Sequence, residues 1–73
     1  MKRDDSVYLN HILDAISRIE SYLQGVGEEA FFRQLLVQDG VIRQIEIIGE
    51  AVKQLSSDLR TQHPQIPWQG IAF

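Results

Sequence analysis

The stretch GVIRQIEIIGEAVKQL, residues 40–55, decides the fold that the sequence predicts. Its apolar residues recur at alternating steps of four and three, which lays one apolar stripe along an α-helix. The pattern continues to Leu59 and predicts a helix over residues 39–60. The stripe consists of Val41, Ile45, Ile48, Val52, Leu55 and Leu59. Gly49 lies in the most apolar turn, where glycine costs about 1 kcal/mol against alanine, so we expect another helix to approach closely there.

A second long helix is predicted upstream, over residues 5–24. Its main apolar stripe also steps by three and four, and consists of Leu9, Ile12, Ile16, Ile19 and Leu23. Asp4, Asp5 and Ser6 offer side-chain oxygens that cap a helix N-terminus. Gly25 is expected to end the helix, because glycine readily adopts the left-handed conformation found after helix C-termini.

Shorter elements are predicted before and after the helix over residues 39–60. Residues 28–34 carry two adjacent aromatics, Phe31 and Phe32, and predict one or two helical turns whose rings close the end of a bundle. Residues 61–67 predict a loop, since a proline at position 64 disfavours helical backbone in the residue before it. Pro67 is expected to be the first residue of a further helix.

The fold class is therefore all-α, an antiparallel helical bundle with two long helices and short ones between and after them. A chain of 73 residues forms one domain at most and is marginal in stability by itself. It has no cysteine, so no disulfide strengthens it. Two long helices do not cover each other's apolar faces, and we expect dimerisation or further helices to complete the bundle.

The net charge of −3 argues against a nucleic-acid-binding surface that extends over the whole chain. No apolar run approaches the roughly 20 residues that cross a bilayer, and the N-terminus does not have the pattern of a secretory signal. These features predict a protein of the cytoplasm that does not associate with membranes.

Three pieces of the sequence together resemble one known family. They are YLNHILDAISRIESYLQG at residues 8–25, IGEA at residues 48–51 and IPW at residues 66–68. In this order and spacing they resemble the HepT-like branch of the HEPN superfamily, over residues 8–72. Each piece is short and weakly specific by itself, and the combination is what makes the resemblance specific.

The resemblance implies a small helical toxin of a bacterial or archaeal toxin–antitoxin pair. Members of the family resemble dimeric, metal-independent ribonucleases that need no cofactor. Their partner is usually an MntA-like nucleotidyltransferase antitoxin, which can attach AMP to a tyrosine close to the toxin's active site. RNA is the expected substrate of full-length relatives.

The family's catalytic signature is an arginine, four to six residues, and a histidine, on the helix that follows IPW. Histidine suits a base near neutral pH, and arginine's planar fork suits the charge that develops on phosphate. In this sequence only five residues follow Trp68, and none is arginine or histidine. The chain therefore resembles a C-terminally truncated member, residues 1–73 being the N-terminal part of one domain, and we expect no catalytic residue in it and no cleavage.

Arg60 and His63 lie upstream of IPW with two residues between them, a spacing that does not match the signature. We interpret Arg60 as a cation at the negative end of a helix and His63 as a solvated loop residue. His11 and Asp14 are three positions apart, but one histidine and one aspartate are too few ligands, so no metal site is predicted.

Two residues are weak candidates for a functional role. Glu50 either lies near the dimer cleft of the family and positions the catalytic arginine, or pairs on the surface with Lys53 or Gln54. Arg43 either pairs with Glu46 or Glu50, which the acidic chain favours, or contacts RNA phosphate. An alternative to the ribonuclease is a non-catalytic helical module that dimerises or binds a partner.

Overall fold

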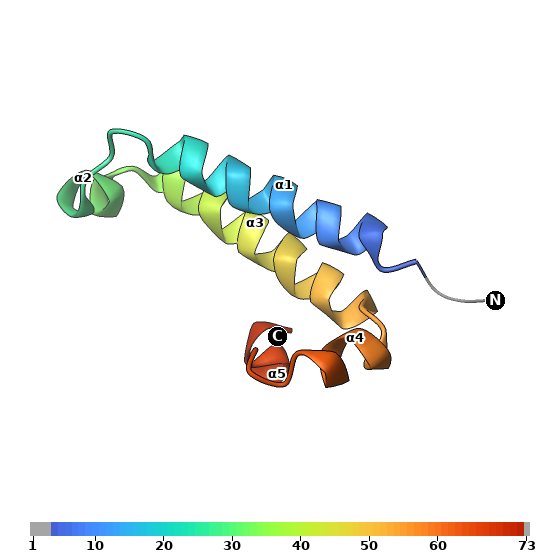
Figure 1. Cartoon of the computed structure of the whole chain (residues 1–73). Helices are drawn as coiled ribbons and strands as arrows, with labels where there is room; N and C mark the ends of the chain where they lie inside the picture. The colour runs from blue at the N-terminus through green and yellow to red at the C-terminus, as the bar shows by residue number, and fades with distance from the viewer. Residues whose placement is uncertain (1–3, 73) are drawn as a thin grey trace.

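A computed structural model describes residues 4–72, and within that range the chain forms five α-helices and no strand. This confirms the all-α class, with two long helices and three short ones (Figure 1). The helices are α1 (Ser6–Leu23), α2 (Glu28–Arg33), α3 (Leu35–Gln54), α4 (Ser57–Gln62) and α5 (Trp68–Ile71).

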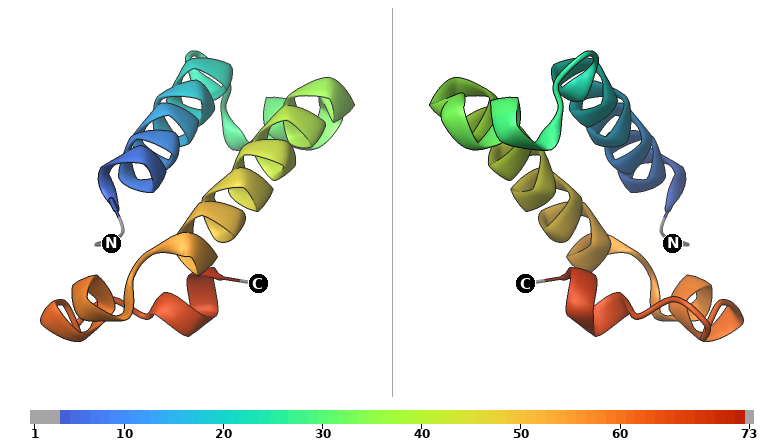
Figure 2. Two further views of the ribbon diagram at one scale, coloured as in Figure 1. Left: turned by 90° about the vertical axis from the view of Figure 1, so that its right-hand side faces the viewer. Right: turned by 90° about the vertical axis from the view of Figure 1, so that its left-hand side faces the viewer.

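Helices α1 and α3 lie side by side and run in opposite directions, forming the hairpin that holds the core (Figures 1 and 2). The buried apolar residues are Ala15 on α1 and Val41, Ala51, Val52 and Leu55 on or just after α3. The apolar periodicity of both segments explains this pairing, because each helix turns one apolar side toward the other.

The side of α1 that faces the core differs from the stripe expected from the sequence. Ala15 is 1% exposed, whereas Leu9 and Ile16 remain 37% and 41% exposed. On α3, Ile45 is likewise 39% exposed. On each helix, the stripe of large apolar residues is therefore rotated about the helix axis relative to the side that contacts the other helix. Part of the apolar surface of both helices remains exposed.

Glycines fix the ends and the closest approach of the hairpin. Gly25 has φ 72°, the left-handed conformation that was expected to end α1. At Gly40, a Cβ atom would lie 3.2 Å from Cε2 of Tyr22, which is tighter than ordinary contact. The glycine therefore lets the Tyr22 ring pack directly against the backbone of α3.

Helix α2 forms where the sequence predicts it, at the far end of the hairpin from the start of α1 (Figure 1). The expectation that both of its aromatic rings close the bundle is wrong for one of them. Phe31 is half-buried, but Phe32 is 68% exposed. Adjacent residues on a helix point about 100° apart, so a single short helix does not turn both rings inward.

The expected helix over residues 39–60 is two helices in the structure. Helix α3 begins at Leu35 and ends at Gln54, and Leu55 and Ser56 are extended, with ψ of 145° and 153°. Ser56 then caps α4, its Oγ accepting a hydrogen bond from the Leu59 N–H at 3.1 Å. A serine inside the periodic stretch thus caps a second helix instead of continuing the first.

The C-terminal arm, residues 57–72, holds α4 and α5. It lies at the end of the hairpin where α1 begins, and α5 folds back beside the last turns of α3 (Figure 2). Gly49 is buried in α3. Pro67 was expected to be the first residue of a helix. In the structure it is the N-cap of α5, which begins one residue later, at Trp68.

Candidate functional site

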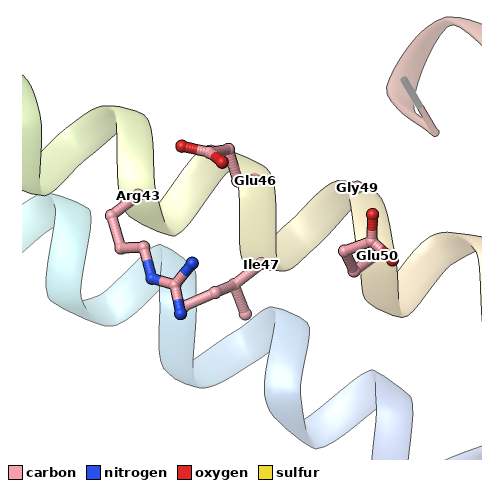
Figure 3. A pocket seen from close by; sticks show the side chains of 5 residues that line it. All are labelled: Arg43, Glu46, Ile47, Gly49 and Glu50. Carbon is pink, nitrogen blue, oxygen red and sulfur yellow. The ribbon is translucent and has the colours of Figure 1, made fainter.

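An open hollow of about 460 Å³ lies on α3 and includes both candidate residues. It is lined by Arg43, Glu46, Ile47, Gly49 and Glu50 (Figure 3). Helical spacing explains the grouping, because residues three and four apart share one side of a helix. Among the residues that the structure describes, all those that line the hollow therefore belong to one helix, α3.

The side chains of the hollow point in different directions. In Figure 3, Arg43 and Ile47 extend toward α1, and Glu46 projects to the opposite side of α3. Arg43, Glu46 and Glu50 are all exposed, whereas Gly49 is buried. The missing side chain at Gly49 deepens the surface between the two glutamates.

Glu50 makes the surface pair that was one of its two expected roles. Lys53 Nζ lies 3.2 Å from Glu50 Oε1, one turn along α3. The side chain of Glu50 is 73% exposed, so the pair is screened by water and contributes little to stability.

The pairing that the sequence favoured for Arg43 is wrong. Within residues 4–72, no ion pair joins Arg43 to Glu46 or Glu50. Glu50 is engaged by Lys53, and Arg43 extends toward α1 rather than along α3. The guanidinium is therefore exposed and able to bind an anion, with two carboxylates close by in the same hollow.

Arg60 and His63 form hydrogen bonds that hold the C-terminal arm together. Arg60 Nη2 donates to the carbonyl of Leu55 at 3.0 Å, so the cation satisfies the C-terminal end of α3 as expected. His63 is exposed in the loop after α4, and its carbonyl accepts a hydrogen bond from Trp68 Nε1 at 3.0 Å. Neither side chain lines the hollow.

His11 is an exposed residue whose ring contacts Tyr8 edge-on, with centroids 6.0 Å apart. Asp14 pairs instead with Arg18, at 3.0 Å, and this hydrogen bond raises the pKa of the Arg18 guanidinium. Residues 4–72 contain no cluster of three metal-ligating side chains.

Apolar side chains are exposed along the hairpin as well. Leu9, Leu13 and Ile16 step by four and three and share one side of α1, and Ile42 and Ile45 share one side of α3. Because the helices are antiparallel, helical geometry turns both rows to the same side of the hairpin. We call these five residues the apolar face. Leu13 is the most exposed of them, at 64%.

Sequence reasoning missed the contact between the start of α1 and the residues just after α3. Asp5 accepts hydrogen bonds from the Ser56 N–H at 2.8 Å and from its hydroxyl at 2.6 Å. Asp5 is 51 residues away from Ser56, so no periodicity or local motif signals this pair. The two N-cap residue types were visible separately, but not their partnership.

None of the helices within residues 4–72 has the length and apolarity to cross a lipid bilayer. The hollow itself combines the exposed guanidinium of Arg43 with the carboxylates of Glu46 and Glu50 on one helix.

Comparison with known proteins places these observations in a family. The sequence profile described as "Ribonuclease HepT-like" matches residues 12–72. The chain is 47% identical over 72 residues to the Methanocaldococcus jannaschii protein named "Gamma-glutamylcyclotransferase and putative RNase", covering 99% of this chain and 32% of the relative.

Two further relatives carry ribonuclease names. The Thermococcus cleftensis "Probable ribonuclease HepT" is 42% identical, covering 99% of this chain and 66% of its own length. A "Putative RNase" of Caldanaerobacter subterraneus is 37% identical, covering 89% of this chain and 58% of its own length. The chain thus spans 32–66% of the length of these relatives. No solved structure was found to match it.

Proposed function

Because this chain belongs to the ribonuclease HepT-like family, we propose that it is part of a toxin of the HepT type, which cleaves RNA without a metal ion. The observation that carries the proposal is the family match over residues 12–72, supported by relatives named as ribonucleases. In this proposal the α1–α3 hairpin is the scaffold on which such a site is built. RNA as substrate also agrees with the cytoplasmic location expected from the sequence.

The catalytic signature implied by the resemblance does not occur in these 73 residues. Arg60 and His63 are the nearest arginine and histidine to IPW, and both have structural contacts. The 73-residue chain by itself is therefore proposed to be inactive toward RNA.

An RNA cleavage assay on the purified 73-residue chain, in EDTA, tests this proposal. The expected result is no cleavage above a buffer control. Cleavage that persists in EDTA and disappears in Arg60→Ala or His63→Ala would contradict the proposed inactivity while supporting the ribonuclease. A longer relative such as the Thermococcus cleftensis protein is the positive control.

Arg43 and Glu50 have supporting roles in this proposal. Arg43 presents a cation that forms no ion pair within residues 4–72 and is suited to an RNA phosphate, and Glu50 lies beside it in the hollow. Arg43→Ala is expected to weaken RNA binding of the chain, measured by fluorescence anisotropy of a labelled oligonucleotide. Arg33→Ala, which removes an exposed arginine of α2, is the matched control.

The second candidate function is association, and the apolar face favours it. Five large apolar side chains lie on one side of the hairpin, and burying them against a second copy or a nucleotidyltransferase antitoxin of the MntA type removes them from water. Leu13→Glu is expected to lower the mass measured by light scattering, whereas Leu36→Glu, at the start of α3, leaves the mass unchanged. Loss of antitoxin binding in a pulldown, with the mass unchanged, identifies the partner as the antitoxin.

A further inference from the structure

The junction between α3 and α4 bends where the sequence does not require a bend. Residues 50–63 contain neither glycine nor proline, and Val52, Leu55 and Leu59 keep the three- and four-residue steps of one helix. A continuous helix through this stretch satisfies its own backbone. A bend needs new partners for the backbone groups that it releases.

Three hydrogen bonds supply those partners. In a continuous helix the N–H groups of Ser56 and Leu59 would donate to the carbonyls four residues earlier. In the structure, the Ser56 N–H donates to Asp5 at 2.8 Å, and the Leu59 N–H donates to Ser56 Oγ at 3.1 Å. The carbonyl of Leu55 accepts from Arg60 Nη2 at 3.0 Å.

Only Asp5 among these partners comes from another part of the chain. Ser56 and Arg60 lie at the bend itself and are present in either conformation. Asp5 also receives the hydroxyl hydrogen of Ser56, at 2.6 Å, and so leaves a lone pair of that oxygen to accept from Leu59. One carboxylate at the start of α1 thus satisfies the released N–H and orients the cap of α4.

The bend also has a cost. Arg60 Nε is buried and has no hydrogen-bond partner among the described residues. A buried donor without a partner disfavours the conformation that contains it. A contact from elsewhere in the chain can offset such a cost, and Asp5 supplies one.

We propose that Asp5 is a latch that keeps the α3–α4 junction bent and holds the C-terminal arm beside α3. Without its carboxylate, residues 35–62 form one helix, and α5 leaves the last turns of α3. The element has two arrangements, bent and straight, and the latch at the start of α1 selects between them. The inference concerns the shape of the chain and does not depend on ribonuclease activity.

Asp5→Ala in the full chain tests the proposal, with two readouts. The Cα chemical shifts of Leu55 and Ser56 are expected to move from extended to helical values. Fluorescence of Trp68, the only tryptophan, is expected to shift toward longer wavelength as α5 becomes solvated. Asp4→Ala is the matched control, because the Asp4 carboxylate accepts hydrogen bonds from Ser6, two residues away.

Extended shifts at Leu55 and Ser56 in Asp5→Ala, with Trp68 emission as in the control, would overturn the latch. The shifts of Ala15 and Val52 report whether the hairpin remains folded. If Asp5→Ala unfolds the hairpin, Asp5→Asn, which keeps one acceptor oxygen, is measured in the same way. A mixture of extended and helical shifts is then expected, and purely extended shifts would contradict the proposal.

Discussion

The α1–α3 hairpin and the C-terminal arm are held by different forces. Within residues 4–72, the buried side chains belong to the hairpin and to Leu55, and neither α4 nor α5 contains a buried residue. The arm is tied by hydrogen bonds to Asp5, within the bend and between Trp68 and His63. Burial of apolar area is the larger stabilising contribution, so the hairpin is the stable unit and the arm is the part that opens first.

The largest expected effect is in the hairpin core. Leu55→Ala removes a side chain that is 1% exposed and should lower the free energy of unfolding by about 2–5 kcal/mol. Leu36→Ala, at a residue 87% exposed, should change it by no more than about 0.5 kcal/mol. Urea denaturation followed by circular dichroism measures both. Equal effects in the two variants would mean that the hairpin core is not where stability resides.

Substitutions at Gly40 in the hairpin and Gly70 in the arm test how tightly each region is packed. Gly40→Val should cost about 1–3 kcal/mol, because the new side chain meets the Tyr22 ring. Gly70→Val should cost little, since nothing lies within 4 Å of a Cβ atom there. Thermal denaturation distinguishes them, and a destabilised Gly70→Val would show that the arm is packed more tightly than the structure indicates.

The bond between the regions is measured by a double-mutant cycle of Asp5→Ala and Ser56→Ala. A hydrogen-bonded carboxylate of this kind is expected to give a coupling energy of about 1.5 kcal/mol, the lower end of the range for charged partners, because both residues are half-exposed. The cycle cancels the separate loss of the Ser56 cap. Additive effects would mean that the arm is not held by this contact.

Surface charge pairs should matter least to the free energy of unfolding. Glu50→Gln breaks the pair with Lys53 and is expected to cost less than about 1 kcal/mol, and less at high salt than at low salt. Urea denaturation at low and high salt is the measurement. A larger loss would mean that Glu50 has a partner other than Lys53.

A small pH dependence is expected at the start of α1. Hydrogen bonds from the hydroxyl and N–H of Ser6 lower the pKa of the Asp4 carboxyl below its ordinary 3.8. A lowered folded-state pKa gives stability that is present above pH 3.8 and is lost as the pH falls through the folded value. Comparing acid unfolding of the natural chain with Asp4→Asn should show a slightly flatter curve in the variant. Identical curves would contradict the contribution.

Apolar periodicity was enough to predict the two long helices of the hairpin, because the spacing of apolar residues along a helix can be read from the local sequence. It placed α1 within one residue at each end and predicted the left-handed turn at Gly25. It did not predict which side of α1 faces α3. Ala15 carries less apolar surface than Leu9 or Ile16, yet it lies on the line of contact, where a small side chain lets two helices approach.

The bend after α3 was not predictable in this way, since its decisive partner lies 51 residues away. The candidate site was only partly predictable. Arg43 and Glu50 do share a hollow, but the pairing of Glu50 with Lys53 rather than Arg43 depends on the direction of individual side chains. Spacing along a helix gives neighbours and does not choose among them.

Native-state hydrogen exchange tests the difference between the two regions most directly. Amides of Val41 to Val52 should exchange only through unfolding of the whole chain, with one shared free energy of opening. Amides of α4 and α5 should exchange through a separate opening of markedly lower free energy, and Asp5→Ala should lower the opening free energy of α5 further. The same free energy of opening in α3 and α5 would contradict the account, because the arm would then be part of the core.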